Sequence, residues 1–356
     1  MEKRILIINL GSTSTKVAVY EDSTLLFQEN VSHDQDDLKD FRWCTDQVDY
    51  RREAIMDVLA KRSFDLNQLD AICSRGGRIP PCKPGAVVVN QEMVDYFYNL
   101  PDNSHISGAG CIIAYQIAEP LNIPAYIYDP TSVDEMAPIA RVSGLPEIPR
   151  FTVGHTLNTR AMAIKCAKEI IGKPFEDCTM IVAHIGGGSS VRLFYKGVCI
   201  DAINDDNGGF SPERTGGIAA VPLVQLCFSG KYTKEKLIKT IRGGGGLKAN
   251  LGTSNALEIE KRIANGDEHA KLVYEAMAYG LAKDIGQMAV PVAGKVDRII
   301  LTGGVAKSAY ITNYISDLVS FIAKVEIMPG ENEIEALAAG ALRVLQGEET
   351  ARVFTI

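Results

Sequence analysis

The sequence predicts an α/β protein of two domains that derive from one duplicated unit. Two segments support this prediction, residues 5–20 (ILIINLGSTSTKVAVY) and residues 181–194 (IVAHIGGGSSVRLF). Each contains an apolar run, a turn rich in glycine and serine, and a second run with apolar residues, which is the pattern of a β-hairpin. A shift of 175 positions places Asn9 on His184, and the match continues without a gap. A repeat over that distance indicates two related halves.

The length and composition agree with two domains. A chain of 356 residues with 46% hydrophobic residues can form two medium-sized cores. Gly144, Pro146 and Pro149 mark the expected boundary, which gives domains 1–148 and 149–356. A C-terminal helix at about 336–356 could pack back on the first domain.

Charge and cysteine usage narrow the possible partners and location. The net charge of −7 and the pI of about 5.4 indicate no broad basic surface, so we expect neither nucleic acid nor membrane as a partner. The eight cysteines form no C-x-x-C pair and are expected to be reduced thiols. No apolar run reaches the length of a membrane span or signal peptide, which predicts a soluble, cytoplasmic protein.

The turn of each hairpin is a candidate phosphate-binding loop. Backbone amides in a turn without Cβ atoms can approach an anion closely. An ordinary glycine turn is the alternative for either loop alone, but the repetition favours two loops that grip the phosphates of one nucleotide. The first loop offers Gly11, Ser12 and Thr13, followed by Lys16, and the second offers Gly186, Gly187, Gly188 and Ser189.

Helical and strand-like patterns fill the rest of the chain. Apolar residues at helical spacing predict helices at 50–62, 91–100, 157–171, 256–263 and 268–290, one ending near Glu119 and one ending near Leu345. Short apolar runs predict strands at 70–74, 124–128, 297–301 and 325–328. Residues 201–209 and 212–217 are expected to be polar loops.

Several polar residues lie where predicted strands end. Arg75 and Arg78 flank two glycines, and their guanidinium groups could bind a carboxylate or phosphate or could simply be solvated. Asp129 follows a strand at the sheet edge where ligands bind in α/β proteins. His105 precedes a helix and is more typical of a cap than of a catalyst. The turn at residues 302–304 could accept an adenine or a ribose, or could be a tight strand-to-helix turn.

These motifs together resemble the acetokinase family of the actin, Hsp70 and sugar-kinase superfamily. The resemblance rests on N-L-G-S-T-S-T-K, H-I-G-G-G-S-S-V, T-G-G-V and the final N-E before a helix. It spans nearly the whole chain and implies a duplicated ribonuclease-H-like, actin-like ATPase fold with an inter-domain cleft. Further segments, among them S-R-G-G, G-H-T-L-N, F-S-P-E-R-T-G-G and P-G-E-N-E, resemble the butyrate kinase branch of the family.

The resemblance implies reversible phosphoryl transfer from ATP to butyrate, with Mg²⁺, giving butanoyl phosphate and ADP. Arg75 and Arg214 would hold the carboxylate and the phosphoryl group, Asp129 would order the site, and His184 would donate to the phosphoryl group. Asn9 and Glu333 would lie near the metal, and Asn255, Gly303 and Gly304 would face the adenosine. Lys16 matches a lysine of the family. The resemblance also implies a homo-oligomer.

Some positions depart from the family pattern, and other functions stay open. Gly154 stands where acetate kinases carry the aromatic residue of F-H-G-T-S-H, and Thr159 stands at the second histidine, so a role for His155 is open. A branched-chain acid such as isobutyrate is an alternative acceptor. A sugar-type kinase with Asp129 as base and a non-enzymatic ATP switch of the actin or Hsp70 type are further alternatives.

Overall fold

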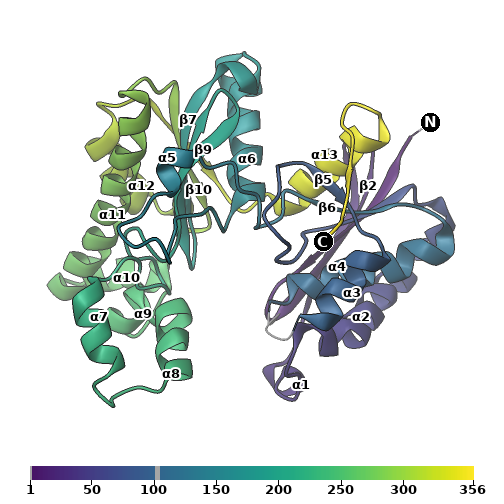
Figure 1. The fold of residues 1–356 in the computed structure, drawn as a ribbon, viewed down its shortest axis with the longest axis horizontal. Helices are drawn as coiled ribbons and strands as arrows, with labels where there is room; N and C mark the ends of the chain where they lie inside the picture. The colour runs from purple at the N-terminus through teal and green to yellow at the C-terminus, as the bar shows by residue number, and fades with distance from the viewer. Residues whose placement is uncertain (1, 101–104) are drawn as a thin grey trace. The chain divides into compact units, whose positions relative to one another are not determined.

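The chain forms two units, each built around one β-sheet (Figure 1). The structure is a computed structural model and describes residues 2–100 and 105–356. Unit 1 comprises Met1–Asp134 and Asn332–Ile356, and unit 2 comprises Glu135–Glu331. The mixed α/β architecture and the two sheets agree with the predicted fold class.

The division between the units falls earlier than the expected boundary at 148/149. Residues 135–150 belong to unit 2 because they bond to its edge strand. The amide of Ala137 donates to the carbonyl of Ile200 at 2.9 Å, and Arg150 forms an ion pair with Asp201 at 2.9 Å. The glycines and prolines near residue 146 therefore lie inside unit 2.

The sheet of unit 1 has the order β12-β5-β6-β4-β1-β2-β3 in the part of the chain that the structure describes. Strand β1 pairs antiparallel with β2 and parallel with β4, which in turn pairs parallel with β6. The strands are β1 (Arg4–Leu10), β2 (Ser14–Glu21), β3 (Thr24–Ser32), β4 (Ala71–Ser74), β5 (Ala86–Val88), β6 (Ala125–Tyr128) and β12 (Arg352–Val353).

Helices cover both faces of this sheet. Helices α2 (Val48–Lys61), α3 (Gln91–Asn99) and α4 (Ser107–Ala118) share one apolar core with alternate side chains of β1, such as Leu6 and Ile8. Helix α13 (Glu333–Leu345) packs on β1, β4 and β6. The end of the chain thus completes the first unit, since β12 also pairs with β5.

The sheet of unit 2 has the order β11-β10-β7-β8-β9. Its strands are β7 (Thr179–Ile185), β8 (Ser189–Tyr195), β9 (Val198–Ile203), β10 (Arg298–Gly303) and β11 (Val325–Pro329). Helices α11 (Glu268–Ala289) and α12 (Ala309–Val319) pack on the face that carries Ile181 and Val191. Helix α6 (Thr156–Lys165) packs on the opposite face, which carries Val182 and Phe194.

Shorter helices complete the two units. They are α1 (Gln35–Leu38) in unit 1 and α5 (Pro138–Arg141), α7 (Ala220–Cys227), α8 (Lys234–Lys239), α9 (Gly246–Leu251) and α10 (Ala256–Ala264) in unit 2. A π-helical turn at Cys166–Ile171 extends α6 to the end that the sequence predicts. The sequence patterns missed strands β3, β5, β9 and β12. Three of them, β3, β9 and β12, are edge strands with exposed or polar positions, and β5 is a three-residue strand next to an edge.

The two predicted hairpins are present, but their turns differ in length. In the first, residues 11–14 lie between the last paired residues, Leu10 and Thr15. In the second, only residues 186–188 lie between Ile185 and Ser189. The gapless sequence match therefore does not extend to the cross-strand pairing, because the second turn is one residue shorter.

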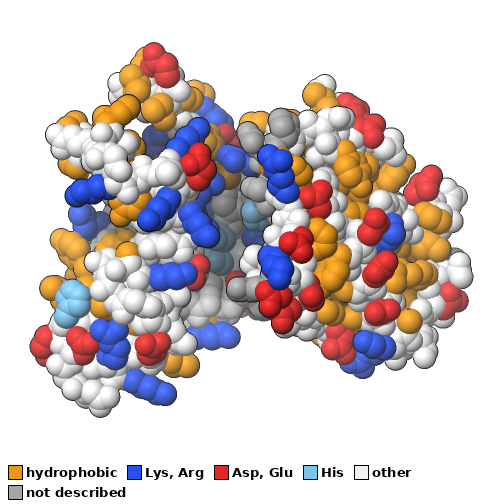
Figure 2. Space-filling view, turned by 90° about the horizontal axis from the view of Figure 1, so that it is seen from below, with side chains coloured by type: hydrophobic (Ala, Val, Ile, Leu, Met, Phe, Trp, Pro, Cys, Tyr) orange, Lys and Arg blue, Asp and Glu red, His pale blue; other side chains and the backbone are white. Residues whose placement is uncertain are grey.

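The helices and one face of the surface (Figure 2) can be compared with the hydropathy and charge of the sequence. Among the residues that the structure describes, no helix is both long and apolar enough to cross a membrane. Figure 2 shows basic, acidic and apolar side chains intermixed over the face that it presents. This distribution agrees with the modest negative net charge of the sequence.

Two helical glycines provide a test of the packing of α13. A Cβ atom added at Gly340 would lie 2.5 Å from the ring of buried Tyr128, whereas at Gly286 in α11 it would meet nothing within 4 Å. We expect Gly340→Ala to lower the free energy of unfolding by about 1–3 kcal/mol through overpacking. Gly286→Ala should raise it by about 0.5–1 kcal/mol because alanine favours the helix. Urea unfolding followed by circular dichroism measures both, and equal effects of the two changes would refute this account.

Candidate active site

The first hairpin turn, residues 11–14, is fixed from behind by Arg51 of α2. This arginine is fully buried and donates from Nη2 to the carbonyl of Ser12 at 2.9 Å and from Nη1 to that of Ser14 at 2.8 Å. The Gly11 amide also donates to the Ser14 carbonyl, at 2.9 Å. Ser12 and Thr13 stay exposed at the tip. Because the carbonyls point back to Arg51, the turn holds one shape and leaves its tip accessible.

Three of the predicted residues meet at the carboxyl end of the first sheet. The Nδ2 of Asn9 donates to Oε2 of Glu333 at 2.7 Å, and Nη2 of Arg75 lies 3.0 Å from Oε1. Asn9 and Glu333 are buried, while Arg75 is partly exposed. Because β1 and β4 pair in parallel, Asn9 at the end of β1 and Arg75 after β4 lie near each other. Helix α13 begins with Glu333, which places this carboxylate beside them.

Two further candidates of unit 1 have structural partners. Asp129 follows β6 with a left-handed φ of 41°, is buried, and accepts from the Gly85 amide at 2.6 Å. This contact fixes the start of β5. Because β4 and β6 pair in parallel, Asp129 and Arg75 follow the same ends of neighbouring strands.

Arg78 is exposed, and His105 contacts Ser107 at the start of α4, in keeping with a cap. Lys16 lies opposite Asn9 in the hairpin.

The second turn, Gly186–Gly188, is held by the loop that carries Arg214. The carbonyl of Gly187 accepts from Ser211 Oγ at 2.8 Å and from the Glu213 amide at 2.9 Å. A side chain at Gly188 is excluded, because its Cβ would lie 2.8 Å from Asp205 Oδ2. The same Asp205 oxygen accepts from Arg214 Nε at 3.1 Å. The structure therefore brings Arg214 beside the bare turn.

His184 is oriented by Asn158 so that one nitrogen serves as a donor. Asn158 Nδ2 lies 2.8 Å from His184 Nδ1 and 3.2 Å from the Gly330 carbonyl, which can only accept. The amide group must therefore donate from Nδ2, and Nδ1 of the histidine accepts. The neutral ring then carries its proton on Nε2. That nitrogen would lie 3.0 Å from a Cβ atom at Gly186, so it lies next to the bare turn.

His155 lies directly against His184. The two rings stack with centroids 3.9 Å apart and planes 9° from parallel, and His155 Nδ1 lies 3.0 Å from Ser190 Oγ. Thr159 is fully buried, and its hydroxyl donates to the backbone carbonyl of His155 at 2.8 Å. The residue at the position of the second family histidine thus bonds back to the start of its own helix and does not reach the turn.

Two of the remaining candidates of unit 2, Asn255 and Gly303, have contacts that support the fold. Asn255 caps α10, since its side chain accepts from the Glu258 amide at 3.2 Å. Gly303 has a φ of +91°, and a Cβ there would lie 2.4 Å from the Ile185 carbonyl, so close strand packing requires glycine. At Gly304 a Cβ would meet nothing within 4 Å. Of the two glycines, Gly304 is the one with open space beside it.

Several residues that hold the site were missed by the sequence analysis. Arg51, Asn158, Asp205 and Glu213 all support a turn or a candidate side chain. A signal existed for Arg51, because it lies on the apolar row of α2 with Val48 and Ile55. A charged residue at a core position of a helix indicates a specific buried partner.

This geometry fits the expected duplicated actin-like α/β fold, with a bare turn, basic residues and a histidine at sheet ends. Comparison with solved structures agrees. An acetate kinase from Porphyromonas gingivalis superposes with a TM-score of 0.79 at 19% identity and covers 97% of this chain and 100% of its own. A propionate kinase from Francisella tularensis superposes with a TM-score of 0.75 at 18% identity, covering 95% and 98%.

Sequence comparison identifies the family. Residues 156–338 match the Acetokinase family. The chain is 46% identical to "Probable butyrate kinase 2" of Caldanaerobacter subterraneus over 99% of both chains. It is 45% identical to "Butyrate kinase 2" of Clostridium acetobutylicum over 99% of this chain and 100% of that one. The chain belongs to the acetokinase family, which confirms the resemblance seen in its motifs.

The pH dependence of stability tests the support of the first turn. His33 Nε2 lies 2.8 Å from Thr15 Oγ1, which also accepts from Arg51. Burial, followed by the Arg51 charge, lowers the His33 pKa from 6.5 to about 4. The stabilisation is therefore complete above pH 6.5 and is lost as the pH falls towards 4. We expect the free energy of unfolding to fall by about 1–3 kcal/mol over this range.

His33→Gln should flatten this part of the pH profile, because the titrating group is gone. The matched control is His269→Gln, which changes an exposed histidine. Urea unfolding at half-unit pH steps measures the difference. A profile that is the same for wild type and His33→Gln would show that His33 does not titrate on unfolding.

Proposed function

We propose that the chain is a carboxylate kinase that transfers the γ-phosphoryl group of ATP reversibly to butyrate, giving butanoyl phosphate and ADP. The observation that carries the proposal is the orientation of His184, whose Nε2–H lies beside the bare turn at Gly186. Relatives named butyrate kinase that are 45% and 46% identical over almost the whole chain support the acceptor.

The acceptor chemistry suits the residues that are present. A short-chain fatty acid is ionised at neutral pH, since carboxyl groups have pKa values near 4. Its oxygen can attack the γ-phosphorus without a general base, while the bond from that phosphorus to the oxygen of ADP breaks. Catalysis then depends on alignment and charge neutralisation, which Arg75 and Arg214 would supply.

The turns and His184 would bind the phosphates. Amides of Gly186–Ser189 and of Gly11–Thr13 would donate to phosphate oxygens, and His184 Nε2–H would donate to the phosphoryl group in transfer. Lys16 would add positive charge to the first loop. Asp129 would order the loop beside Arg75, and Asn255 would hold the start of α10 on the adenosine side. Gly304 would leave room for the adenosine, and Gly303 would let the end of β10 pack closely beside it.

Mg²⁺ would be held by Glu333 and Asn9. In the described residues no group of three or more His, Cys, Asp and Glu side chains could hold a metal alone. One carboxylate with an amide neighbour fits a magnesium ion that arrives with a nucleotide, because Mg²⁺ usually binds one or two carboxylates plus phosphates. When bound, the ion neutralises charge on the β- and γ-phosphate oxygens.

Trapping of the acyl phosphate with hydroxylamine tests the function. ATP and butyrate should give an acyl hydroxamate, and acids of two to five carbons, straight and branched, should rank the acceptors. Slow ATP hydrolysis that no acid accelerates would instead indicate an ATP switch. Self-association and a cytoplasmic location remain part of the proposal, and light scattering measures the former.

Replacement of the two arginines tests their role in charge neutralisation. We expect Arg75→Ala and Arg214→Ala to lower turnover by at least about 100-fold while the fold is kept. The matched controls are Arg4→Ala and Arg298→Ala, which remove arginines paired with Glu21 and Glu326 in the same two sheets. The controls should stay within about twofold of wild type. Near-normal kinetics of a folded Arg75 or Arg214 variant would remove that residue from the mechanism.

A further inference from the structure

Asp284 of α11 is a buried carboxylate that has no role in the proposed mechanism. It is 7% exposed, and within residues 2–100 and 105–356 no lysine or arginine forms an ion pair with it. The ammonium group of the adjacent Lys283 instead lies 5.6 Å from the ring centroid of Tyr279. Burial of an aspartate without a paired cation is unfavourable. The hydrogen bond that this carboxylate makes therefore indicates its purpose.

The partner of Asp284 is the loop that carries Arg214, residues 204–217. Asp284 Oδ2 accepts from the Gly209 amide at 2.7 Å. The loop approaches α11 without side chains, because a Cβ atom at Gly208 would lie 2.5 Å from Asp284 Oδ2 and one at Gly209 would lie 2.9 Å from the backbone of α11. The backbone of the loop thus lies directly against the helix at this carboxylate.

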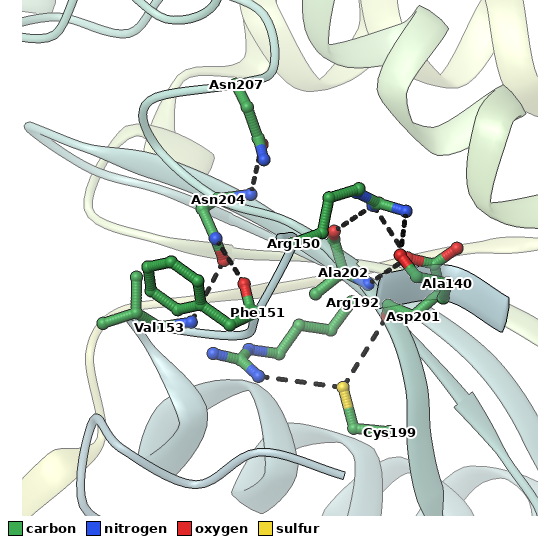
Figure 3. A network of polar contacts seen from close by, with 10 residues as sticks. All are labelled: Ala140, Arg150, Phe151, Val153, Arg192, Cys199, Asp201, Ala202, Asn204 and Asn207. Atoms are coloured by element: carbon green, nitrogen blue, oxygen red, sulfur yellow. Dashed lines mark hydrogen bonds and ion pairs between the residues drawn. The ribbon is translucent and has the colours of Figure 1, made fainter. Parts of the chain in front are cut away.

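Gly209 lies between two points at which the same loop is tied down. At its start, the side chain of Asn204 donates to the carbonyl of Phe151 at 2.8 Å (Figure 3). Near its end, the Gly217 amide donates to the Gly208 carbonyl at 2.7 Å. The bond to α11 therefore holds the middle of a loop whose two ends are already fixed.

The position of Gly209 affects Arg214 because the loop closes around it. Arg214 Nε donates to Asp205 Oδ2 at 3.1 Å, so the two members of this ion pair lie on opposite sides of Gly209 in the chain. The second half of the loop also reaches the bare turn, since Ser211 Oγ donates to the Gly187 carbonyl at 2.8 Å. A displacement at Gly209 would therefore shift Arg214 relative to the turn.

The charge of Asp284 is not needed for the fold. Burial raises its pKa from 3.8 to about 6, although the Gly209 bond and the charge of Lys283 lower it in part. Ile203 of β9 and Gly208 of the loop, which lie near the same carboxylate, are uncharged. Because the pKa is higher in the folded protein than in the unfolded chain, ionised Asp284 lowers stability above about pH 6, and this loss disappears as the pH falls towards 3.8.

An asparagine at this position could accept from the same amide without that loss of stability. A bond to an ionised acceptor is about twice as strong as a neutral one, so the carboxylate holds the loop more firmly. A residue that lowers stability while it fixes a loop of the site is typical of a functional role.

We propose that Asp284 is a positioning residue for phosphoryl transfer, whose carboxylate holds Gly209 on α11 and so keeps Arg214 aligned beside the bare turn. This inference rests on the proposed function, in which Arg214 neutralises the phosphoryl group in transfer. Asp284 acts through the loop and not through contact with a substrate. Alignment matters here, because a displacement of about 1 Å can lower a rate by about 100-fold.

A double-mutant cycle with the hydroxamate assay tests the proposal. Asp284→Asn removes the charge and keeps the size of the side chain. Near neutral pH it should lower kcat at least about tenfold in the wild-type background, but less than about twofold in the Arg214→Ala background, where no arginine is left to misalign. The matched control is Glu275→Gln, which removes a carboxylate bonded to Tyr310 from the same helix and should stay within about twofold of wild type. Equal losses in both backgrounds would indicate a merely structural role and overturn the inference.

The pH profile gives a second readout that a structural role would not produce. The ratio of wild-type kcat to that of Asp284→Asn should approach one as the pH falls through about 6, because protonated Asp284 is as neutral as asparagine. The ratio at each pH also cancels the titration of ATP and of the acid. The urea midpoint of Asp284→Asn should equal or exceed that of wild type near neutral pH. A ratio independent of pH, or a clearly lower midpoint, would contradict the proposed role of the charge.

Hydrogen exchange followed by mass spectrometry separates this inference from the proposed function. Peptides that cover residues 204–217 should exchange at least about threefold faster in Asp284→Asn than in wild type, but not in Glu275→Gln. If wild type phosphorylates butyrate and the exchange is unchanged, the inference fails and the kinase stands. If no acid gives a hydroxamate, the kinase proposal fails, while faster exchange still supports Asp284 as the anchor of this loop and unchanged exchange overturns that as well.

Discussion

The shape of the two glycine turns depends on groups that bind their backbone carbonyls from behind. Arg51 holds the carbonyls of Ser12 and Ser14, whereas Ser211 and the Glu213 amide hold the carbonyl of Gly187. A turn without side chains has many accessible conformations, so these bonds offset the entropy that glycine loses when it is ordered. Both units thus hold a glycine turn through its backbone carbonyls, but they use different residues to do so. The turns are therefore preorganised for an anion, which is the condition for electrostatic catalysis.

In each candidate cluster, the arginine is paired with a carboxylate. Glu333 lies between Asn9 and Arg75, and Arg214 is paired with Asp205. These pairs hold the arginines in place while part of each guanidinium stays accessible. Arg192 of β8 differs, because Nε and Nη2 of its buried guanidinium have no hydrogen-bond partner.

The parts of the fold with strong local patterns could be predicted from the sequence. The hairpins, the long helix α11 and the buried strands β4, β6 and β7 carry continuous apolar runs or clear helical spacing. Edge strands such as β3 and β12 do not, because their positions are partly exposed and their pairing depends on distant residues. In the same way, Asn9, Arg75 and His184 could be named from motifs, but Arg51 and Asn158 act through contacts that no local pattern encodes. Which residues surround a bare turn is a property of the tertiary fold.

Unit 1 is made of two separate stretches of the chain, and this affects the order in which the two units can fold during synthesis. Unit 2 is one continuous stretch, so it has all of its strands while the chain is still growing. Unit 1 obtains α13 and β12 only after the whole of unit 2 has been synthesised, and buried Phe354 completes its core at that stage. Until then one face of its sheet lacks its helix, and the edge at β5 is unpaired. The nascent chain thus depends on residues 332–356, which follow unit 2, to complete the unit that was translated first.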